Sequence, residues 1–133
     1  MSQENVEIVR RWLEAYNRRE VERLLDVSHP DVEFRSVFAA LESSGVFRGR
    51  EGALEYFREI DRAYDDFVLV PLEFLDTAEQ VLLAAEAKWR GKESGAVGST
   101  PVWLAFWLRT GKVLHEKTFT DRTEALDAVG LSE

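Results

Sequence analysis

The segment "GKVLHEKTFTDRTEAL", residues 111–126, places one of the two histidines of the chain directly before a glutamate. A histidine in contact with a carboxylate can exchange protons near neutral pH, as general acid–base catalysis requires. The first half of the segment is typical of a β-strand, in which adjacent side chains point to opposite faces of the sheet. His115 and Glu116 are therefore not expected to form one site. Taking Thr118 as inward, we expect Glu116 and Leu114 to face the interior and His115 to face outward.

Two glutamates, Glu116 and Glu86, are the candidate acid–base residues. Glu86 interrupts the apolar strand "VLLAAEAKW", where a buried carboxylate needs compensation. We expect Arg35, in "VEFRSVF", to reach the same interior. An ion pair of Arg35 with either glutamate would be structural, whereas an unpaired glutamate with a raised pKa would be a functional candidate. The sequence alone leaves both interpretations open.

Four aromatic residues are predicted to line an interior cavity. Trp12 and Tyr16 belong to the apolar stripe of the first predicted helix, while Trp103 and Trp107 lie on the strand "PVWLAFWLR". If Ala105 points inward, both strand tryptophans do so too, and the rings form a flat slot suited to an apolar or ring-containing ligand. The alternative is that these rings only fill the core. A shift of one residue in the strand would reverse its two faces.

Hydrophobic periodicity predicts four helices and five strands in a single domain that spans residues 1–133. The third helix is expected to bury Leu54 and Phe57, and Asp121 is expected to cap the last helix three residues before Glu124. Strands that follow one another with short turns indicate a mainly antiparallel sheet with helices on one face, which is an α+β fold. The strands are predicted over residues 32–38, 65–76, 80–91, 101–109 and 112–120, and the first two helices begin near Ser2 and Val21.

Composition and charge exclude several classes of function. The net charge of −8 disfavours nucleic-acid binding, which needs clustered basic residues. We expect no membrane span, because no apolar run approaches the roughly 18 residues that a span needs. The N-terminus has no secretory signal, so we expect a cytoplasmic protein. The chain has no cysteine, and its two histidines lie on unrelated elements, so neither a metal site nor a cofactor is expected.

Several segments together resemble the SnoaL-like proteins. These segments are "HPDVEF", "GVFRGREGALEYF", "FLDTAEQVLL", "WRGKESG" and "GKVLHEKTFTDRTEALDAVGL", and they span nearly the whole chain. SnoaL-like proteins belong to the cone-shaped superfamily that also contains ketosteroid isomerase, limonene epoxide hydrolase and nuclear transport factor 2. The resemblance implies a curved antiparallel sheet around an inner cavity. It also implies a homodimer formed through the outer face of the sheet.

The catalytic acids of these relatives are not found at the matching positions. The general base of ketosteroid isomerase matches Arg35 or the neighbouring Ser36, and its two oxyanion-hole donors match Trp12 and Ala105. The acid of the SnoaL-type cyclases matches Thr118 or the residue on either side of it. The resemblance therefore leaves open whether the chain is an enzyme.

Two functions stay open after the sequence is read. In the first, a small apolar molecule binds in the cavity, with Glu116 or Glu86 available for cofactor-free acid–base chemistry. The walls of the ligand site would then be Trp12, Tyr16, Trp103 and Trp107, with Thr118 also in contact. Arg35 and one of the two glutamates would orient a polar end of the ligand. In the second, the cavity is packed with the protein's own aromatic side chains, and the chain is a non-catalytic module for dimerisation or protein interaction.

Overall fold

The structure is a computed structural model that describes residues 2–36 and 45–131. Within these residues it contains four helices and six strands. None of the described helices is long and apolar enough to cross a membrane. The helices are α1 (Ser2–Arg18), α2 (Val21–Asp26), α3 (Gly49–Ala63) and α4 (Arg122–Ala128), and the strands are β1 (Ser28–Arg35), β2 (Val46–Arg48), β3 (Tyr64–Asp76), β4 (Gln80–Gly91), β5 (Val97–Arg109) and β6 (Lys112–Phe119).

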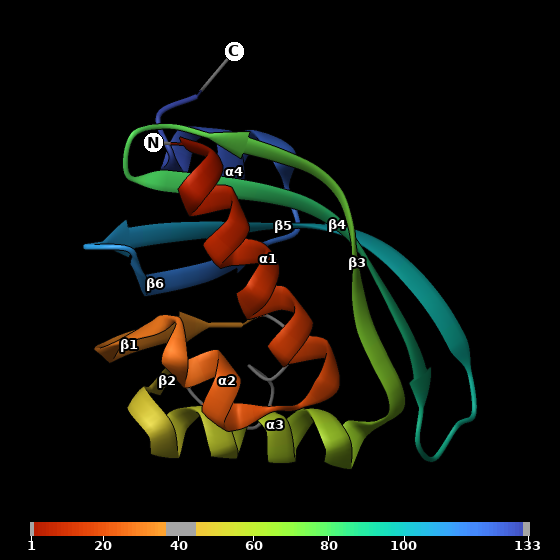
Figure 1. Cartoon of the computed structure of the whole chain (residues 1–133). Helices are drawn as coiled ribbons and strands as arrows, with labels where there is room; N and C mark the ends of the chain where they lie inside the picture. Colours follow the sequence, from red (N-terminus) through yellow and green to blue (C-terminus); the bar gives the residue numbers. More distant parts are fainter. Residues whose placement is uncertain (1, 37–44, 132–133) are drawn as a thin grey trace.

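The strands form one curved, unclosed sheet in the order β2-β1-β6-β5-β4-β3 (Figure 1). Neighbouring strands are antiparallel, except that β1 and β6 run parallel. Helices α1, α2 and α3 pack on the inner face of the sheet, and α4 packs on its outer face. This arrangement confirms the predicted α+β fold, a mainly antiparallel curved sheet around helices. The prediction of helices on one face only is wrong for α4, because Leu126 and Val129 give it an apolar side that packs on the outer face.

Three features of the sheet differ from the prediction. β5 begins at Val97 instead of residue 101. The three-residue β2 lies in a segment predicted to be a loop, because so short a strand shows no alternation that can be recognised. β1 begins at Ser28 instead of Val32, and Ser28 pairs with Val113 of β6. The register of this pair shifts between Ser28 and Glu33, a stretch that includes Pro30. Proline cannot donate a ladder hydrogen bond, so it disfavours the prediction of a strand here. The irregular start of β1 therefore does not show the regular pattern by which a strand is predicted.

Helix α1 carries the aromatic side chains that enter the cone. Val9, Trp12, Leu13 and Tyr16 recur every three or four residues, and each is at most 4% exposed. A stripe at this spacing occupies one side of a helix and packs against an apolar surface. It therefore lays α1 across the inner face of the sheet (Figure 1).

The C-terminal end of α1 is attached to β3, which is an edge strand of the sheet. The Asn17 side chain donates from Nδ2 to the Leu69 carbonyl and accepts from the Leu69 N–H, both at 2.9 Å. Arg19 donates to the carbonyl groups of Tyr16 at 2.9 Å and of Phe67 at 3.1 Å. The bonds to Leu69 and Phe67 satisfy backbone groups of an edge strand that no neighbouring strand can pair, and they fix the position of α1.

The buried face of helix α3 differs in part from the predicted one: Phe57 is buried as predicted, but Leu54 is not. Tyr56 and Phe57 are 5% and 6% exposed, whereas Leu54, which was predicted to be buried, is 38% exposed. A Cβ atom on Gly52 would lie 2.7 Å from the Phe47 backbone carbon, so only glycine allows α3 to lie this close to β2. The close approach brings the Tyr56 ring against the Phe47 ring, with the centroids 5.2 Å apart.

Helix α4 covers part of the outer face of the sheet. Asp121 accepts a hydrogen bond from the Glu124 N–H at 3.2 Å, which confirms the predicted N-cap. Leu126 and Val129 then pack in a second apolar cluster with Ala105 of β5. Because of this cluster, β5 is apolar on both faces.

We expect Asn17→Ala to lower the free energy of unfolding by about 1–3 kcal/mol, because two half-buried backbone groups of Leu69 lose their partner. Urea unfolding followed by tryptophan fluorescence measures this change. Arg18→Ala, at the adjacent exposed position, is the control and should alter stability by less than about 0.5 kcal/mol. Equal stability of Asn17→Ala and the wild type would show that water replaces the side chain without cost.

Candidate acid–base site inside the cone

Glu116 lies on the inner face of β6 and is 3% exposed. In the sheet it lies between Phe34 of β1 and Phe106 of β5. The Thr118 hydroxyl donates a hydrogen bond to Glu116 Oε2 at 2.8 Å. His115 is exposed on the opposite face. The predicted orientation of β6 is therefore confirmed for Glu116, Thr118 and His115, and the histidine and the glutamate form no dyad.

The environment of Glu116 disfavours its charged form. Burial raises the pKa of its carboxyl from 4.5 to about 8, and the smaller effect of the Thr118 hydrogen bond lowers this pKa. A carboxyl with such a pKa is mostly protonated at neutral pH and can both donate a hydrogen bond and release a proton. Glu116 thus has the property that acid–base catalysis at neutral pH requires.

Two tyrosines form a buried hydrogen-bonded pair near this carboxyl. The hydroxyl oxygens of Tyr16 on α1 and Tyr56 on α3 are 2.5 Å apart, and the Ser36 hydroxyl donates to Tyr56 Oη at 3.1 Å. Burial raises the pKa of both tyrosines, the Glu116 carboxylate raises both further, and the Arg19 guanidinium lowers both. Both hydroxyls therefore stay protonated at neutral pH and serve as hydrogen-bond donors.

Tyr56 and Ser36 complete the site, and the sequence predicts a functional role for neither. The resemblance gives Ser36 only as an alternative to Arg35 for the position of the ketosteroid isomerase base. In the structure Ser36 is 5% exposed and lies on the inner side. Tyr56 was missed because the buried stripe of α3 was placed on Leu54. The spacing of Ala53, Tyr56 and Phe57 was a signal that could have identified the correct face.

Trp12 is held next to Tyr16 by aromatic contacts. Its ring stacks on Tyr16 with centroids 5.3 Å apart and meets the edge of Phe106 at 5.0 Å. The tryptophan is 1% exposed, and its Nε1–H has no hydrogen-bond partner among the described residues. The predicted interior position of Trp12 and Tyr16 is confirmed.

The predicted inward orientation of Trp103 and Trp107 is wrong. Leu104 and Phe106 belong to the main core, whereas Ala105 packs under α4 with Trp103 and Trp107 beside it. The strand is shifted by one residue relative to the prediction, so its two tryptophans lie on the outer face. Because α4 covers part of that face, both faces of β5 are apolar and alternation gave no signal to distinguish them.

Arg35 and Glu86 are also on the outer face, which corrects their predicted interior position. Arg35 is exposed and forms an ion pair with Glu33 at 3.1 Å. Glu86 is half-buried and accepts a hydrogen bond from the Ser99 hydroxyl. The considered ion pair of Arg35 with Glu86 or Glu116 is therefore not formed.

Leu114 does not face the cone interior, contrary to the prediction. The strand pairing shifts there, because Trp107 lies opposite His115 and Leu108 lies opposite Val113. Val113 is fully buried in the main core, and Leu114 instead lines a surface groove beside Trp107. The extra residue of a bulge lies outside the regular alternation, which a sequence pattern does not reveal.

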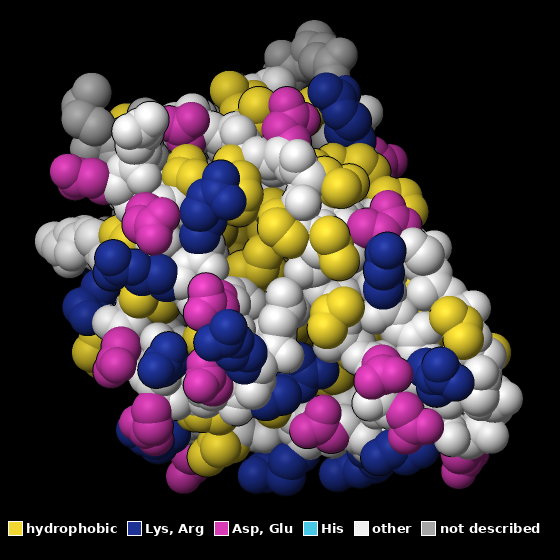
Figure 2. All heavy atoms as spheres, turned by 45° about the vertical axis from the view of Figure 1, so that its right-hand side comes forward, with side chains coloured by type: hydrophobic (Ala, Val, Ile, Leu, Met, Phe, Trp, Pro, Cys, Tyr) yellow, Lys and Arg dark blue, Asp and Glu magenta, His cyan; other side chains and the backbone are white. Residues whose placement is uncertain are grey.

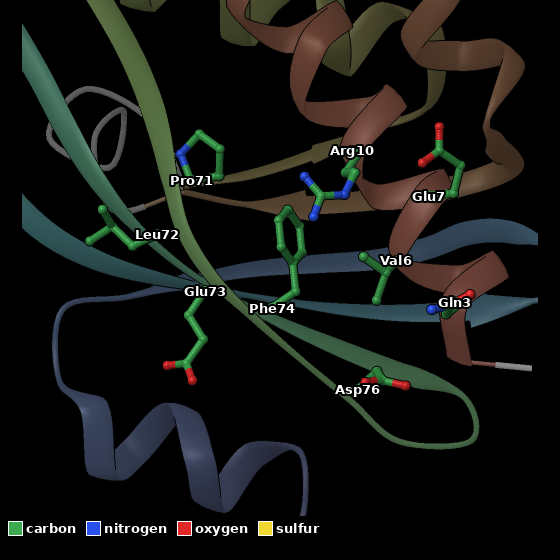
Figure 3. Close-up of a pocket in the computed structure, with 9 residues that line it drawn as sticks. All are labelled: Gln3, Val6, Glu7, Arg10, Pro71, Leu72, Glu73, Phe74 and Asp76. Carbon is green, nitrogen blue, oxygen red and sulfur yellow. The ribbon is translucent and has the colours of Figure 1, made fainter.

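A separate groove lies between the N-terminal half of α1 and the edge strand β3 (Figure 3). Its volume is about 620 Å³, and the Arg10 guanidinium lies 4.3 Å from the centre of the Phe74 ring within it. Figure 2 shows hydrophobic side chains in a hollow on this side of the molecule. The residues that line the groove do not include Glu116 or the tyrosine pair.

The interior site therefore combines a neutral carboxylic acid, two phenols and an indole N–H against aromatic walls. These groups can hydrogen-bond an acceptor atom and move a proton. Within the described residues, no group of three His, Asp or Glu side chains is placed to hold a metal ion.

A family model of the SnoaL-like domain matches residues 9–116. The chain belongs to the SnoaL-like domain family.

Solved structures show the same fold as this SnoaL-like chain. An NTF2-like protein of unknown function from Burkholderia pseudomallei has a TM-score of 0.80 and 19% identity, covering 96% of this chain and 97% of its own. An NTF2-like protein from Burkholderia xenovorans has a TM-score of 0.78 and 26% identity, covering 96% of both chains. TerC, co-crystallised with polyporic acid, has a TM-score of 0.79 and 19% identity, covering 96% of this chain and 98% of its own. No curated protein matches the sequence significantly.

The raised pKa of Glu116 predicts that stability falls as pH rises. Between about 4.5 and about 8 the folded state holds a proton that the unfolded state has released. The free energy of unfolding should therefore decrease across this window, by up to about 1.4 kcal/mol per pH unit from this group. Urea unfolding across the window, with Glu116→Gln beside the wild type, measures the difference in slope.

Glu116→Gln should lose this part of the pH dependence, because glutamine does not titrate. Thr118→Val removes the hydrogen bond that lowers the pKa of Glu116, so the decline should continue to higher pH than in the wild type. Identical slopes for the wild type and Glu116→Gln would contradict a raised pKa at this position.

Proposed function

We propose that this SnoaL-like domain binds a small, mainly apolar molecule inside the cone and exchanges a proton with it through Glu116, without a cofactor. The observation that carries the proposal is the buried carboxyl of Glu116, which is held neutral beside a buried tyrosine pair. A structural carboxyl is normally exposed or paired with a cation. A protonated carboxyl in an aromatic interior lowers stability and is typical of a functional site.

The chemistry resembles that of ketosteroid isomerase, which also keeps a carboxylic acid neutral in an apolar site next to a tyrosine donor. Here the Thr118 hydroxyl occupies Glu116 Oε2, so Oε1 is the oxygen that would carry the exchangeable proton. Whichever of Tyr16 and Tyr56 donates within the pair, the other keeps a hydroxyl hydrogen for a ligand oxygen. A carbonyl compound that forms an enol is the substrate class that this set of donors favours.

The solved structures support the proposal only at the level of fold. TerC was co-crystallised with polyporic acid, so a small organic molecule has been crystallised together with a protein of this fold. The alternative is a non-catalytic module whose interior is only a packed core. It is favoured by the tight aromatic contacts around Trp12 and by the location of Trp103 and Trp107 outside the cone.

We expect the protein to accelerate exchange of the α-protons of small cyclic ketones, such as 2-tetralone, in deuterated buffer. Glu116→Gln should reduce this exchange roughly 100-fold or more at a pH near 8. There the carboxylate form of Glu116 takes the α-proton as the enol forms, and the resulting acid exchanges its proton with solvent before it returns a deuteron to the carbon; glutamine keeps the side-chain volume but cannot take the proton. Proton NMR of the ketone follows the exchange, and thermal unfolding confirms that the variant is folded. An unchanged rate in Glu116→Gln would remove Glu116 from the mechanism, and no acceleration by the wild type would favour the non-catalytic module.

We also propose that the protein forms a homodimer through the outer face of the sheet. Val68 and Val70 on β3 are each 37% exposed, and Val97 on β5 is 73% exposed. Val68 and Val97 line one shallow groove of about 510 Å³ on this face. The groove also contains the charged side chains of Asp66, Lys88 and Arg90, so a second copy would make both apolar and charged contacts there. The cytoplasmic location and the absence of a nucleic-acid partner stay predictions.

We expect sedimentation equilibrium to give twice the chain mass of 15.3 kDa. Val70→Lys should shift the protein toward the monomer, because a charge would be buried in the interface. Leu54→Lys is the matched control, since Leu54 on α3 is 38% exposed and Val70 is 37% exposed. A wild-type protein that sediments as a monomer, or a Val70→Lys variant that stays dimeric, would contradict this interface.

A further inference from the structure

We infer that the groove between α1 and β3 is a second binding site, in which Arg10 holds the carboxylate of a small aromatic or otherwise apolar molecule (Figure 3). This site is separate from the interior acid–base site and goes beyond the proposed function. The groove has a volume of about 620 Å³, which lies within the range of small-molecule sites. Its apolar lining consists of Val6, Pro71, Leu72 and Phe74.

The width of the groove is fixed by the way in which α1 is attached on either side of it. Toward the end of the helix, Asn17 bonds to the Leu69 backbone at 2.9 Å. Near its start, Asn5 Nδ2 donates to the Ala78 carbonyl at 3.2 Å. The strand residues that line the groove, 71–74 and 76, lie between these two points of attachment. The groove is therefore formed before a ligand arrives, which lowers the cost of binding.

Arg10 presents its hydrogen-bond donors to the groove. Its guanidinium carbon lies 4.3 Å from the centre of the Phe74 ring, and its side chain extends from α1 toward Pro71 (Figure 3). Arg10 forms no hydrogen bond or ion pair with another described residue. A guanidinium that lies over an aromatic ring makes this contact with its face, so the N–H groups on its edge stay available. A planar carboxylate can accept two of these N–H groups at once.

The acidic side chains around the groove do not neutralise Arg10. Glu7 belongs to an exposed pair with Arg11, at 3.7 Å, one turn further along α1. The Glu73 carboxylate points away from Arg10, toward the side of the sheet that α4 covers (Figure 3). Asp76 is the last residue of β3 and lies at the end of the groove. Arg10 is thus the charged group at the centre, while the surrounding carboxylates disfavour a ligand with more than one negative charge.

The apolar lining provides the contact for the rest of the ligand. Leu72 is 64% exposed and lies where the pairing of β3 with β4 shifts register. A bulge of this kind takes a side chain out of the regular alternation of the strand. A ligand ring that covers Leu72 and Val6 removes apolar surface from water, while the carboxylate of the same ligand binds Arg10. A monocarboxylate on a flat apolar body is therefore the ligand class that fits the groove.

The test uses 2-naphthoate as the probe and 2-naphthamide as its uncharged analogue, which has the same rings and an amide in place of the carboxylate. Isothermal titration near neutral pH and at low salt measures both affinities for the full chain. We expect 2-naphthoate to bind about tenfold more tightly than 2-naphthamide. This difference should shrink as salt is added, because the groove is open to solvent and salt screens the charge of Arg10.

Substitutions of Arg10 separate its charge from its shape. Arg10→Gln should weaken the binding of 2-naphthoate about tenfold and leave that of 2-naphthamide nearly unchanged. Arg10→Lys should recover only part of the affinity, because an ammonium group cannot offer a planar pair of donors. Arg11→Gln is the matched control, since it removes a neighbouring exposed arginine that does not line the groove, and it should change the affinity less than about twofold.

NMR of the methyl-labelled chain shows where the probe binds. A naphthalene ring in the groove should move the methyl signals of Val6 and Leu72 through its ring current. The methyl groups of Val32 and Leu104 belong to the buried main core and should stay in place.

The possible outcomes separate this site from the proposed function. The inference is overturned if 2-naphthoate does not bind, if it binds the wild type and Arg10→Gln equally, or if the cation 2-naphthylmethylammonium binds more tightly. A probe that moves the Leu104 signal but not those of Val6 and Leu72 occupies the cone interior, which overturns the groove site and leaves the proposed function standing. Binding in the groove by a protein that does not accelerate ketone exchange would support this site and count against the proposed function alone.

Discussion

The attachment of α1 across the inner face of the sheet is the interaction on which the rest of the interior depends. At its C-terminal end, Asn17 and Arg19 bond to the backbone of the edge strand β3. In its middle, Trp12 packs on Phe34 and Phe106 from two different strands. With both regions fixed, Tyr16 points toward Tyr56, so the hydrogen-bonded pair is a consequence of how α1 lies. A helix displaced along the sheet would separate the pair and expose Glu116 to a different environment.

The sequence predicts most of this architecture because amphipathic elements carry strong signals. The α1 stripe and the Asp121 cap follow from periodicity and turn chemistry. The inward position of Glu116 follows from the resemblance, which matches Thr118 to an acid of the SnoaL-type cyclases, and the structure confirms all three. The signal fails on β5, where Trp103 and Trp107 lie outside the cone because α4 makes the outer face apolar as well. A strand that is buried on both faces has no polar side to reveal its register.

The parts of the site that the sequence could not provide come from long-range packing. Tyr56 is 40 residues from Tyr16, and the pair forms only because α3 lies close against β2, where Gly52 leaves room for the Phe47 backbone. The sequence predicts interior positions for Arg35 and Glu86, where a buried charge needs a partner of opposite charge or a hydrogen bond. Each strand instead places its charge on the outer face, where Glu33 and Ser99 supply those partners.

The position of Glu116 explains how a SnoaL-like chain without the expected family acids can still hold an acid in the cone. The resemblance matches the acid of the SnoaL-type cyclases to Thr118 or an adjacent residue, and Thr118 lies two residues further along the same strand. Side chains two residues apart share a face, so an acid at 116 enters the same interior as one at 118, whereas residues 115 and 117 cannot. The hydrogen bond from Thr118 to Glu116 shows that the two positions are in contact. An acid that is moved by two residues along the strand therefore still faces the interior, but it would reach different atoms of a ligand. This is a physical route by which one fold accommodates different chemistries.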